Sequence, residues 1–154
     1  MLRSYVAGLL LIGLVACGQT SVPSTPNETS NQSDAPSLDN TTWTLSTLFG
    51  EPVIEGVTHP EKGIDNPAVV VKFKTGTLEG YGGCETYDGG YEYTDTDFTL
   101  RTLSYYHRPC PDAVVTQEHA YFEALGNSVF TYGIEDDKLT FYDGIGGVTM
   151  EFTR

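Results

Sequence analysis

Basic side chains are scarce in this sequence. The chain has 8 Lys and Arg against 21 Asp and Glu, which gives a formal net charge of −13 at pH 7. Nucleic-acid binding needs clustered Lys and Arg that displace counterions from the phosphates. The composition therefore argues against nucleic acid as a partner, and anionic lipid headgroups should repel the body of the protein.

Long apolar runs are also missing, except for one stretch near the N-terminus. Arg3 is followed there by mostly apolar residues from about Tyr5 to Ala16. A membrane-spanning helix needs ~20 apolar residues, whereas the core of a signal peptide needs roughly 7–15. Residues 1–16 are therefore predicted to be a signal peptide, and the protein is predicted to be exported.

Cysteine is rare as well, and the first of three cysteines directly follows this stretch. The segment Leu14-Val15-Ala16-Cys17 resembles the bacterial lipobox, in which a cysteine after a small residue is acylated and becomes the new N-terminus. The resemblance implies a lipoprotein that is held at the membrane through acylated Cys17. An ordinary secreted protein, cleaved nearby, is the alternative. Two or more acyl chains would anchor the protein stably, whereas one chain would not.

The segment that follows is poor in apolar side chains. Ser, Thr, Pro, Asn and Gln dominate residues 18–37, and Val22 is the one sizeable apolar residue among them. Such a segment cannot bury enough surface to offset the entropy lost on ordering. We predict that residues 17–37 form a lipidated cysteine with a disordered tether, and that residues 38–154 form one domain.

Strand patterns fill most of that domain. Short β-branched and aromatic runs alternate with turn residues, which is typical of antiparallel strands joined by hairpins. One connection, residues 49–67, is polar, contains several Gly and Pro residues, and is predicted to be mobile. The strands are expected near residues 41–48, 68–74, 77–82, 90–94, 97–102, 128–134, 138–143 and 147–153.

One segment has a helical pattern instead. Residues 112–126 place Val115, Phe122 and Leu125 on one face of a helix, and Gly126 is suited to end it. The predicted fold class is therefore α+β, mostly β. We expect a curved antiparallel sheet or a small open barrel with one helix packed on it.

Two cysteines remain inside the domain, and Cys84 has three conceivable uses. A nucleophile needs a lowered thiol pKa, a neighbouring base and a reducing compartment, and of these three only the base is available, as His107 or His119. A zinc site needs three or four ligands, which Cys84, Cys110 and one histidine do not supply. Export favours oxidised pairs, so a Cys84–Cys110 disulfide is the preferred interpretation. No catalytic residue, metal ligand or cofactor is predicted.

A group of polar-tipped aromatic residues is the candidate binding surface. Tyr105, Tyr106, His107 and Arg108 are consecutive. On a loop they could form a recognition surface. Alternatively, the tyrosines close one end of the core, and we favour this second interpretation because a curved sheet needs large plugs.

Several short motifs occur in an order that resembles a known family. They are Trp43, Gly80-Tyr81-Gly82-Gly83-Cys84, Gly89-Gly90-Tyr91, Arg108-Pro109-Cys110-Pro111, Gln117-Glu118 and Phe122-x-x-Leu125. This order resembles the META domain family of HslJ-like bacterial lipoproteins and covers nearly all of residues 38–154. The family usually has asparagine where this chain has Glu85, so any role of that amide does not carry over.

The resemblance implies a lipid-anchored, non-enzymatic cell-envelope protein that acts as a binding or envelope stress-related module. Gly18 follows the lipidated cysteine, in place of the aspartate that retains lipoproteins at the inner membrane of enteric bacteria. The resemblance therefore favours the outer membrane, where the source has one. Its partner would be another envelope protein or an apolar ligand.

Two other hypotheses remain. In the first, the domain is a carrier or pilot-like module that binds an apolar ligand or an amphipathic segment of a partner. This hypothesis predicts a cavity lined by Val71, Phe73, Tyr81, Phe122 and Phe141. In the second, it is a hydrolase-like enzyme that uses His107 or His119 with a nearby carboxylate.

Overall fold

The computed structural model describes residues 37–106, 108–126 and 129–154. The predicted signal peptide, Cys17 and nearly all of the predicted tether lie outside the described residues, as does His107. Within the described part of the chain, no helix is long and apolar enough to cross a bilayer.

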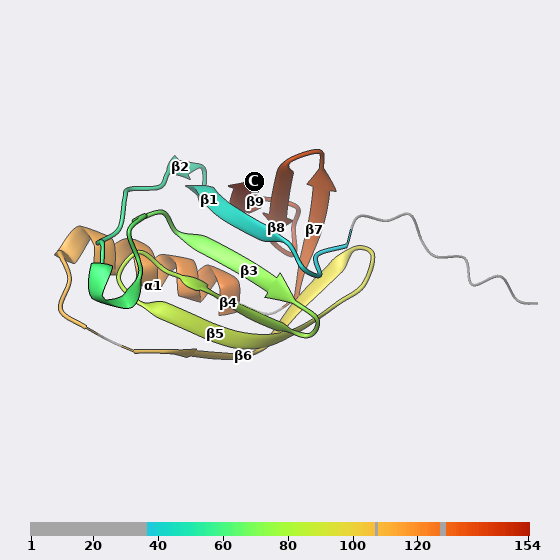
Figure 1. Ribbon diagram of the computed structural model, residues 1–154. Helices are drawn as coiled ribbons and strands as arrows, with labels where there is room; N and C mark the ends of the chain where they lie inside the picture. The colour runs from blue at the N-terminus through green and yellow to red at the C-terminus, as the bar shows by residue number, and fades with distance from the viewer. Residues whose placement is uncertain (1–36, 107, 127–128) are drawn as a thin grey trace, which may run out of the picture. The chain divides into compact units, whose positions relative to one another are not determined.

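The domain is built on one antiparallel sheet (Figure 1). The strands follow the order β2-β1-β3-β4-β5-β6-β7-β8-β9, and an additional pairing between β1 and β9 closes the sheet into a ring that leaves β2 outside. Their bounds are β1 Thr42–Leu48, β2 Glu51–Pro52, β3 Val70–Lys74, β4 Thr77–Tyr81, β5 Thr86–Tyr93, β6 Asp97–Tyr105, β7 Val129–Glu135, β8 Lys138–Tyr142 and β9 Val148–Thr153. The predicted fold class is confirmed.

The helix α1, Asp112–Gly126, lies between β6 and β7 in the chain and has the predicted bounds. Its buried face differs from the predicted one by one position, because Val114 is buried and Val115 only half-buried. Tyr121 and Phe122 of this face pack against the sheet. The ring centroids of Phe122 and Tyr87 are 5.2 Å apart.

Alternating side chains of the strands fill the interior of the ring. Successive residues of a strand face opposite sides, so every second apolar residue joins the core. Phe73, Phe98, Phe141 and Phe152 are fully buried and meet mostly edge to face at 5.1–6.0 Å. Trp43, the single tryptophan, is also fully buried.

The cavity predicted by the carrier hypothesis is contradicted by this packing. Val71, Phe73, Phe122 and Phe141 are buried among their neighbours in the core, instead of lining a hollow interior. Tyr81 lies on the other face of the sheet, because it pairs with outward-facing Val70. An interior ligand site is therefore the wrong prediction for this fold.

The connection between β2 and β3 covers that outer face at the end of β4. It contains a short 3₁₀ helix, Pro60–Lys62, and a β-bridge between His59 and Ile64. The Val57 N–H donates to the carbonyl of Gly83 at 2.7 Å, and the Gly56 N–H donates to Pro67 at 2.9 Å. These hydrogen bonds hold the connection together and against the β4–β5 turn, and the mobility of residues 49–67 stays a prediction.

Candidate functional site

The connection between β4 and β5 lies at the centre of a cluster of hydrogen bonds and ion pairs. Residues 81–85, Tyr-Gly-Gly-Cys-Glu, are all buried. The Gly82 N–H donates to the carbonyl of Glu85 at 2.8 Å and closes a tight turn. Gly83 has a φ of 112°, a backbone conformation that favours glycine.

Gly82 is required for a different reason. A Cβ atom at this position would lie 2.6 Å from Oε1 of Glu118 and 2.7 Å from the ring of Phe122. Both distances are shorter than real carbon contacts allow. The glycine therefore makes room for a helix carboxylate to approach the backbone of the turn.

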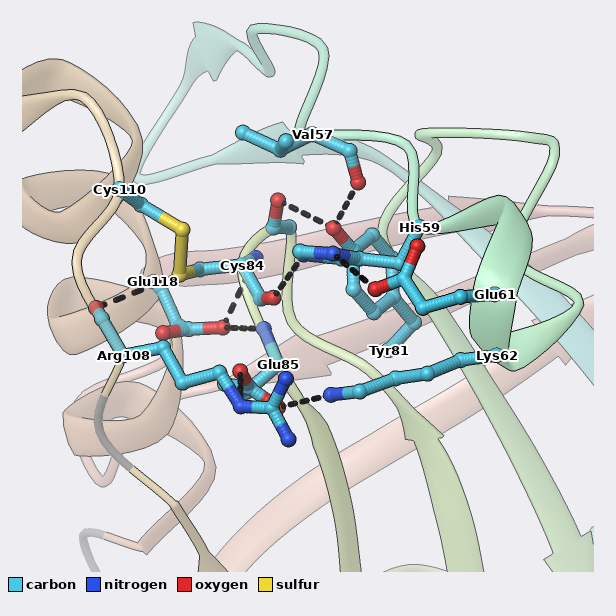
Figure 2. Close-up of a disulfide and its surroundings, with 11 residues drawn as sticks. Val57, His59, Glu61, Lys62, Tyr81, Cys84, Glu85, Arg108, Cys110 and Glu118 are labelled. Atoms are coloured by element: carbon cyan, nitrogen blue, oxygen red, sulfur yellow. Dashed lines mark hydrogen bonds and ion pairs between the residues drawn. A yellow bond between two sulfur atoms is a disulfide. The ribbon is translucent and has the colours of Figure 1, made fainter.

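The structure joins Cys84 and Cys110 in a disulfide (Figure 2). The two Cα atoms are 6.2 Å apart, and the bond connects the β4–β5 turn to the segment that leads into α1. Cys84 is 1% exposed. A disulfide-bonded, buried sulfur is neither a nucleophile nor a thiolate ligand, so the other two uses of Cys84 do not apply to this arrangement.

Glu118 anchors the helix to the turn. Its Oε1 accepts the N–H of Cys84 at 3.0 Å and the N–H of Glu85 at 2.9 Å, while its side chain is 2% exposed. A carboxylate that accepts buried backbone N–H groups forms stronger hydrogen bonds than a neutral acceptor. Sequence reasoning missed this role, because Glu118 was considered only as part of a motif.

Glu85 is a buried carboxylate held between two cations, as Figure 2 shows. It is 1% exposed, with Nζ of Lys62 at 2.9 Å from Oε2 and Nε of Arg108 at 2.7 Å from Oε1. Among the described residues, Oε1 of Glu85 accepts no hydrogen bond, so its contact with the Arg108 guanidinium is an ion pair only. Burying a carboxylate is costly unless it is paired, and Lys62 and Arg108 supply that pairing from two separate segments.

His59 and Tyr81 complete the cluster. Nε2 of His59 donates to the carbonyl of Cys84 at 3.0 Å, and Nδ1 lies 3.2 Å from Oε1 of Glu61. The Tyr81 hydroxyl donates to the carbonyl of Gly83 at 2.7 Å and also contacts the carbonyl of Val57. Burial raises the pKa of Tyr81 and outweighs the hydrogen bond to Val57, which lowers it. The raised pKa keeps the hydroxyl protonated, so it remains a donor.

These contacts define what the cluster can do. It ties together the β2–β3 connection, the β4–β5 turn, the segment before α1, and α1 itself. Each of its polar side chains is engaged by a neighbour, and within the described ranges no group of three or more His, Cys, Asp or Glu residues could hold a metal ion. The arrangement fits a structural tie better than a site of covalent chemistry.

The predicted binding surface is divided by the structure. Arg108 turns into the disulfide cluster, whereas Tyr105 ends β6 and packs 4.3 Å from Phe122 between ring centroids. Tyr106 is 77% exposed. The favoured interpretation of these tyrosines as plugs of the core is therefore wrong for Tyr106, because the strand ends before this residue can turn inward.

The structure describes one of the two histidines of the enzyme hypothesis. His107 lies outside the described residues, and His119 is on the exposed side of α1. The histidine that does lie beside the disulfide is His59, which sequence reasoning did not consider. Its ring is used to fix the carbonyl of Cys84.

A shallow hollow is present on the outer face of the sheet. Its volume is about 470 Å³, and it lies over β1, β3, β4 and β5. An ion pair, Lys72 Nζ to Glu79 Oε1 at 3.7 Å, forms part of its lining. It is not the apolar interior cavity that the carrier hypothesis requires.

Comparisons with known proteins agree with the architecture. A family model described as META domain matches residues 36–154. One NMR structure of a protein is 15% identical, covers 75% of this chain and 90% of its own, and superimposes with a TM-score of 0.57. An NMR structure of a protein from Burkholderia xenovorans is 21% identical, covers 86% of this chain and 98% of its own, and has a TM-score of 0.55.

Similarity at these identities establishes the fold alone. No protein of the curated collection matches the chain. The biochemical role must therefore be argued from the chain's own residues.

Proposed function

The chain belongs to the META domain family, and on that premise we propose that it is an exported, acyl-anchored cell-envelope protein that binds a partner instead of catalysing a reaction. The observation that carries the proposal is the use of Cys84 and Cys110. Their disulfide joins buried Cys84 to half-buried Cys110, in a cluster whose polar side chains are already paired with neighbours. Such a bond persists in an oxidising compartment and serves stability.

Export and anchoring are supported from the other end of the chain. The apolar stretch before Cys17 has the length of a signal core, and Cys17 stands in a lipobox-like setting. The polar residues 18–37 would let an acylated N-terminus sit in the bilayer while the acidic domain stands off in water. Gly18 after the lipidated cysteine favours the outer membrane where the source has one.

Binding is favoured over catalysis by where exposed side chains lie. The interior is filled, so a partner must contact the outside of the domain. Tyr106 presents an amphipathic ring next to Tyr105, which is also exposed, at the end of β6, and tyrosine is enriched in protein interfaces. We assign the recognition surface to this end of β6, with an envelope protein as the partner and a role in envelope stress.

Anchoring is tested by growing cells with radiolabelled palmitate and comparing the native chain with Cys17→Ala. The native chain should carry label and sediment with membranes, and on a density gradient it should follow the outer membrane. Cys17→Ala should carry no label and should be released in soluble form. Equal sedimentation of both chains without label in either would overturn the anchoring.

Recognition is tested with a photoreactive phenylalanine analogue at Tyr106 and, as a matched control, at exposed Phe49. The analogue at Tyr106 should crosslink one dominant envelope protein that the analogue at Phe49 does not capture. That protein, once identified and purified, should bind the native domain and lose affinity for Tyr106→Ser. Equal capture from both positions would contradict a recognition surface at this end of β6.

A further inference from the structure

The edge of β6 is open over most of its length. On one side β6 pairs with β5 from Phe98 to Tyr105. On the other side β7 pairs only with Asp97, Phe98 and Thr99. In the part of the chain that the structure describes, no strand pairs with the far side of Leu100–Ser104, and Figure 1 shows none drawn along it.

An open strand edge has a defined binding chemistry. Alternate residues point their N–H and C=O groups away from the neighbouring strand, at the spacing of a β-ladder. Another extended polypeptide supplies donors and acceptors at that same spacing. We call the main chain of Leu100–Ser104 the open edge. Its free N–H and C=O groups therefore favour binding of another polypeptide segment in the strand conformation.

The side chains of the open edge fit the same kind of partner. Leu100 and Leu103 are only partly buried, although both pack against the hydrophobic core. Apolar side chains on the core-facing side of an added strand would pack against these two leucines and cover them. Thr102 and Ser104 are exposed on the opposite side, where polar residues of an added strand would lie.

The charge of the protein decides which kind of partner segment the open edge favours. The chain carries a formal net charge of −13, so two copies repel each other. Every Lys and Arg of the described residues is already engaged by a carboxylate, including Arg101 at the open edge, which pairs with Glu92. Asp88, opposite Ser104 on β5, is exposed and has no ion pair among the described residues. A basic segment is attracted to this surface, whereas a second copy is not.

We propose that the open edge of β6 binds an extended segment of another protein by strand addition, with apolar side chains of the segment over Leu100 and Leu103 and basic side chains facing water. The proposal rests on the function proposed above, since it names the kind of partner that the same end of β6 would recognise. Arg101, which is left out of the pairing with β5, limits such pairing to short segments.

The test uses the native domain and three synthetic hexapeptides with blocked ends. The first alternates Lys and Val, the second has the same side chains with alternate amides methylated, and the third alternates Glu and Val. Binding is followed by NMR chemical shifts and by hydrogen exchange of the amides of residues 100–104. The methylated peptide is the matched control, because it keeps the charge and apolar surface but loses main-chain donors.

The Lys–Val peptide should slow exchange at the open edge, and methylation should weaken its binding by about tenfold or more, as expected for the loss of two or three hydrogen bonds. The Glu–Val peptide should bind more weakly still, because of repulsion. Binding of the methylated peptide within about twofold of the parent, or shifts that map away from β6, would overturn strand addition. Protection of residues 100–104 that depends on protein concentration without peptide would show self-pairing and would overturn a foreign partner.

A pair of protein variants gives a second readout. Leu103→Lys adds repulsion and removes an apolar contact at the open edge, whereas Thr131→Lys adds the same charge on β7, at a residue paired on both sides. Leu103→Lys should lose binding of the Lys–Val peptide, and Thr131→Lys should retain it. Equal binding by both folded variants would contradict the proposal. The palmitate experiment does not depend on this edge, so a failure here is distinguishable from a failure of the anchoring.

Discussion

Replacing Glu118 by alanine tests whether this carboxylate holds the disulfide turn on the helix. The substitution removes the acceptor of two buried N–H groups, those of Cys84 and Glu85, at 3.0 and 2.9 Å. A hydrogen bond to a charged group contributes about 1.5–3 kcal/mol, and an unpaired buried donor retains its full desolvation penalty. The two donors share one oxygen, so we expect Glu118→Ala to lower the free energy of unfolding by about 3–5 kcal/mol.

Such a loss is a large part of the roughly 5–15 kcal/mol that stabilises an ordinary domain. Urea unfolding under non-reducing conditions measures it, with the fluorescence of Trp43 as the probe, since this single tryptophan is fully buried. Hydrogen exchange adds local detail. The amides of Cys84 and Glu85 should exchange faster in the variant before global unfolding begins.

Two further variants make the reasoning refutable. Glu118→Gln keeps an acceptor oxygen and should lose only about 1–2 kcal/mol. Glu123→Ala changes an exposed residue of the same helix and should stay within about 0.5 kcal/mol of the native chain. A loss below about 1 kcal/mol for Glu118→Ala, or equal losses for the alanine and glutamine variants, would refute an anchoring role.

Three other perturbations follow from the same cluster and core. Replacing both Cys84 and Cys110 by serine should lower the free energy of unfolding by about 3–4 kcal/mol in urea, because the bond spans 26 residues; an unchanged midpoint would contradict a stapling role. Gly82→Ala should lose about 1–3 kcal/mol by pushing the helix carboxylate off the turn, whereas Gly144→Ala, which has open space around it, should change little; equal effects would exclude crowding. Burial raises the pKa of Tyr132 to about 12, so its contribution to stability is present below the unfolded value of about 10 and is lost as the pH rises through about 12. The difference in tyrosinate ultraviolet absorbance between the folded native chain and folded Tyr132→Phe, followed as the pH rises, checks this, and a difference that already appears near pH 10 would contradict it. Burial also raises the pKa of three further tyrosines, Tyr87, Tyr91 and Tyr121.

The strands and the helix could be predicted because their signals are local. Alternation of buried and exposed residues places β3, and the change of period marks α1. The burial of Glu118 had a signal too. It lies four residues after Val114 and four before Phe122, so its helix position is on the apolar face.

The face of Tyr81 was also available from the pattern. Leu78 faces the core, and Tyr81 is three residues later in the same strand, so it must face the other side. The alternation along β4 does not explain why Tyr81 is buried although it faces outward. The covering segment around His59 comes from a connection without periodicity, and only tertiary contacts place it there.

The pairing of Glu85 could not be derived from spacing. Lys62 precedes it by 23 residues in an irregular segment, and Arg108 follows the end of β6. Both cations reach Glu85 because the disulfide and the β2–β3 connection bring these segments together. Glu85 is therefore accommodated by partners that no local rule identifies.

The central claim is that one cysteine is acylated and the other two are bonded to each other. The intact mass of the mature protein, extracted from membranes with detergent and kept unreduced, tests both parts at once. We expect a chain that begins at Cys17, carries an acyl increment, and weighs two hydrogens less than its reduced form. A chain without an acyl increment, or one whose mass does not change on reduction, would contradict it.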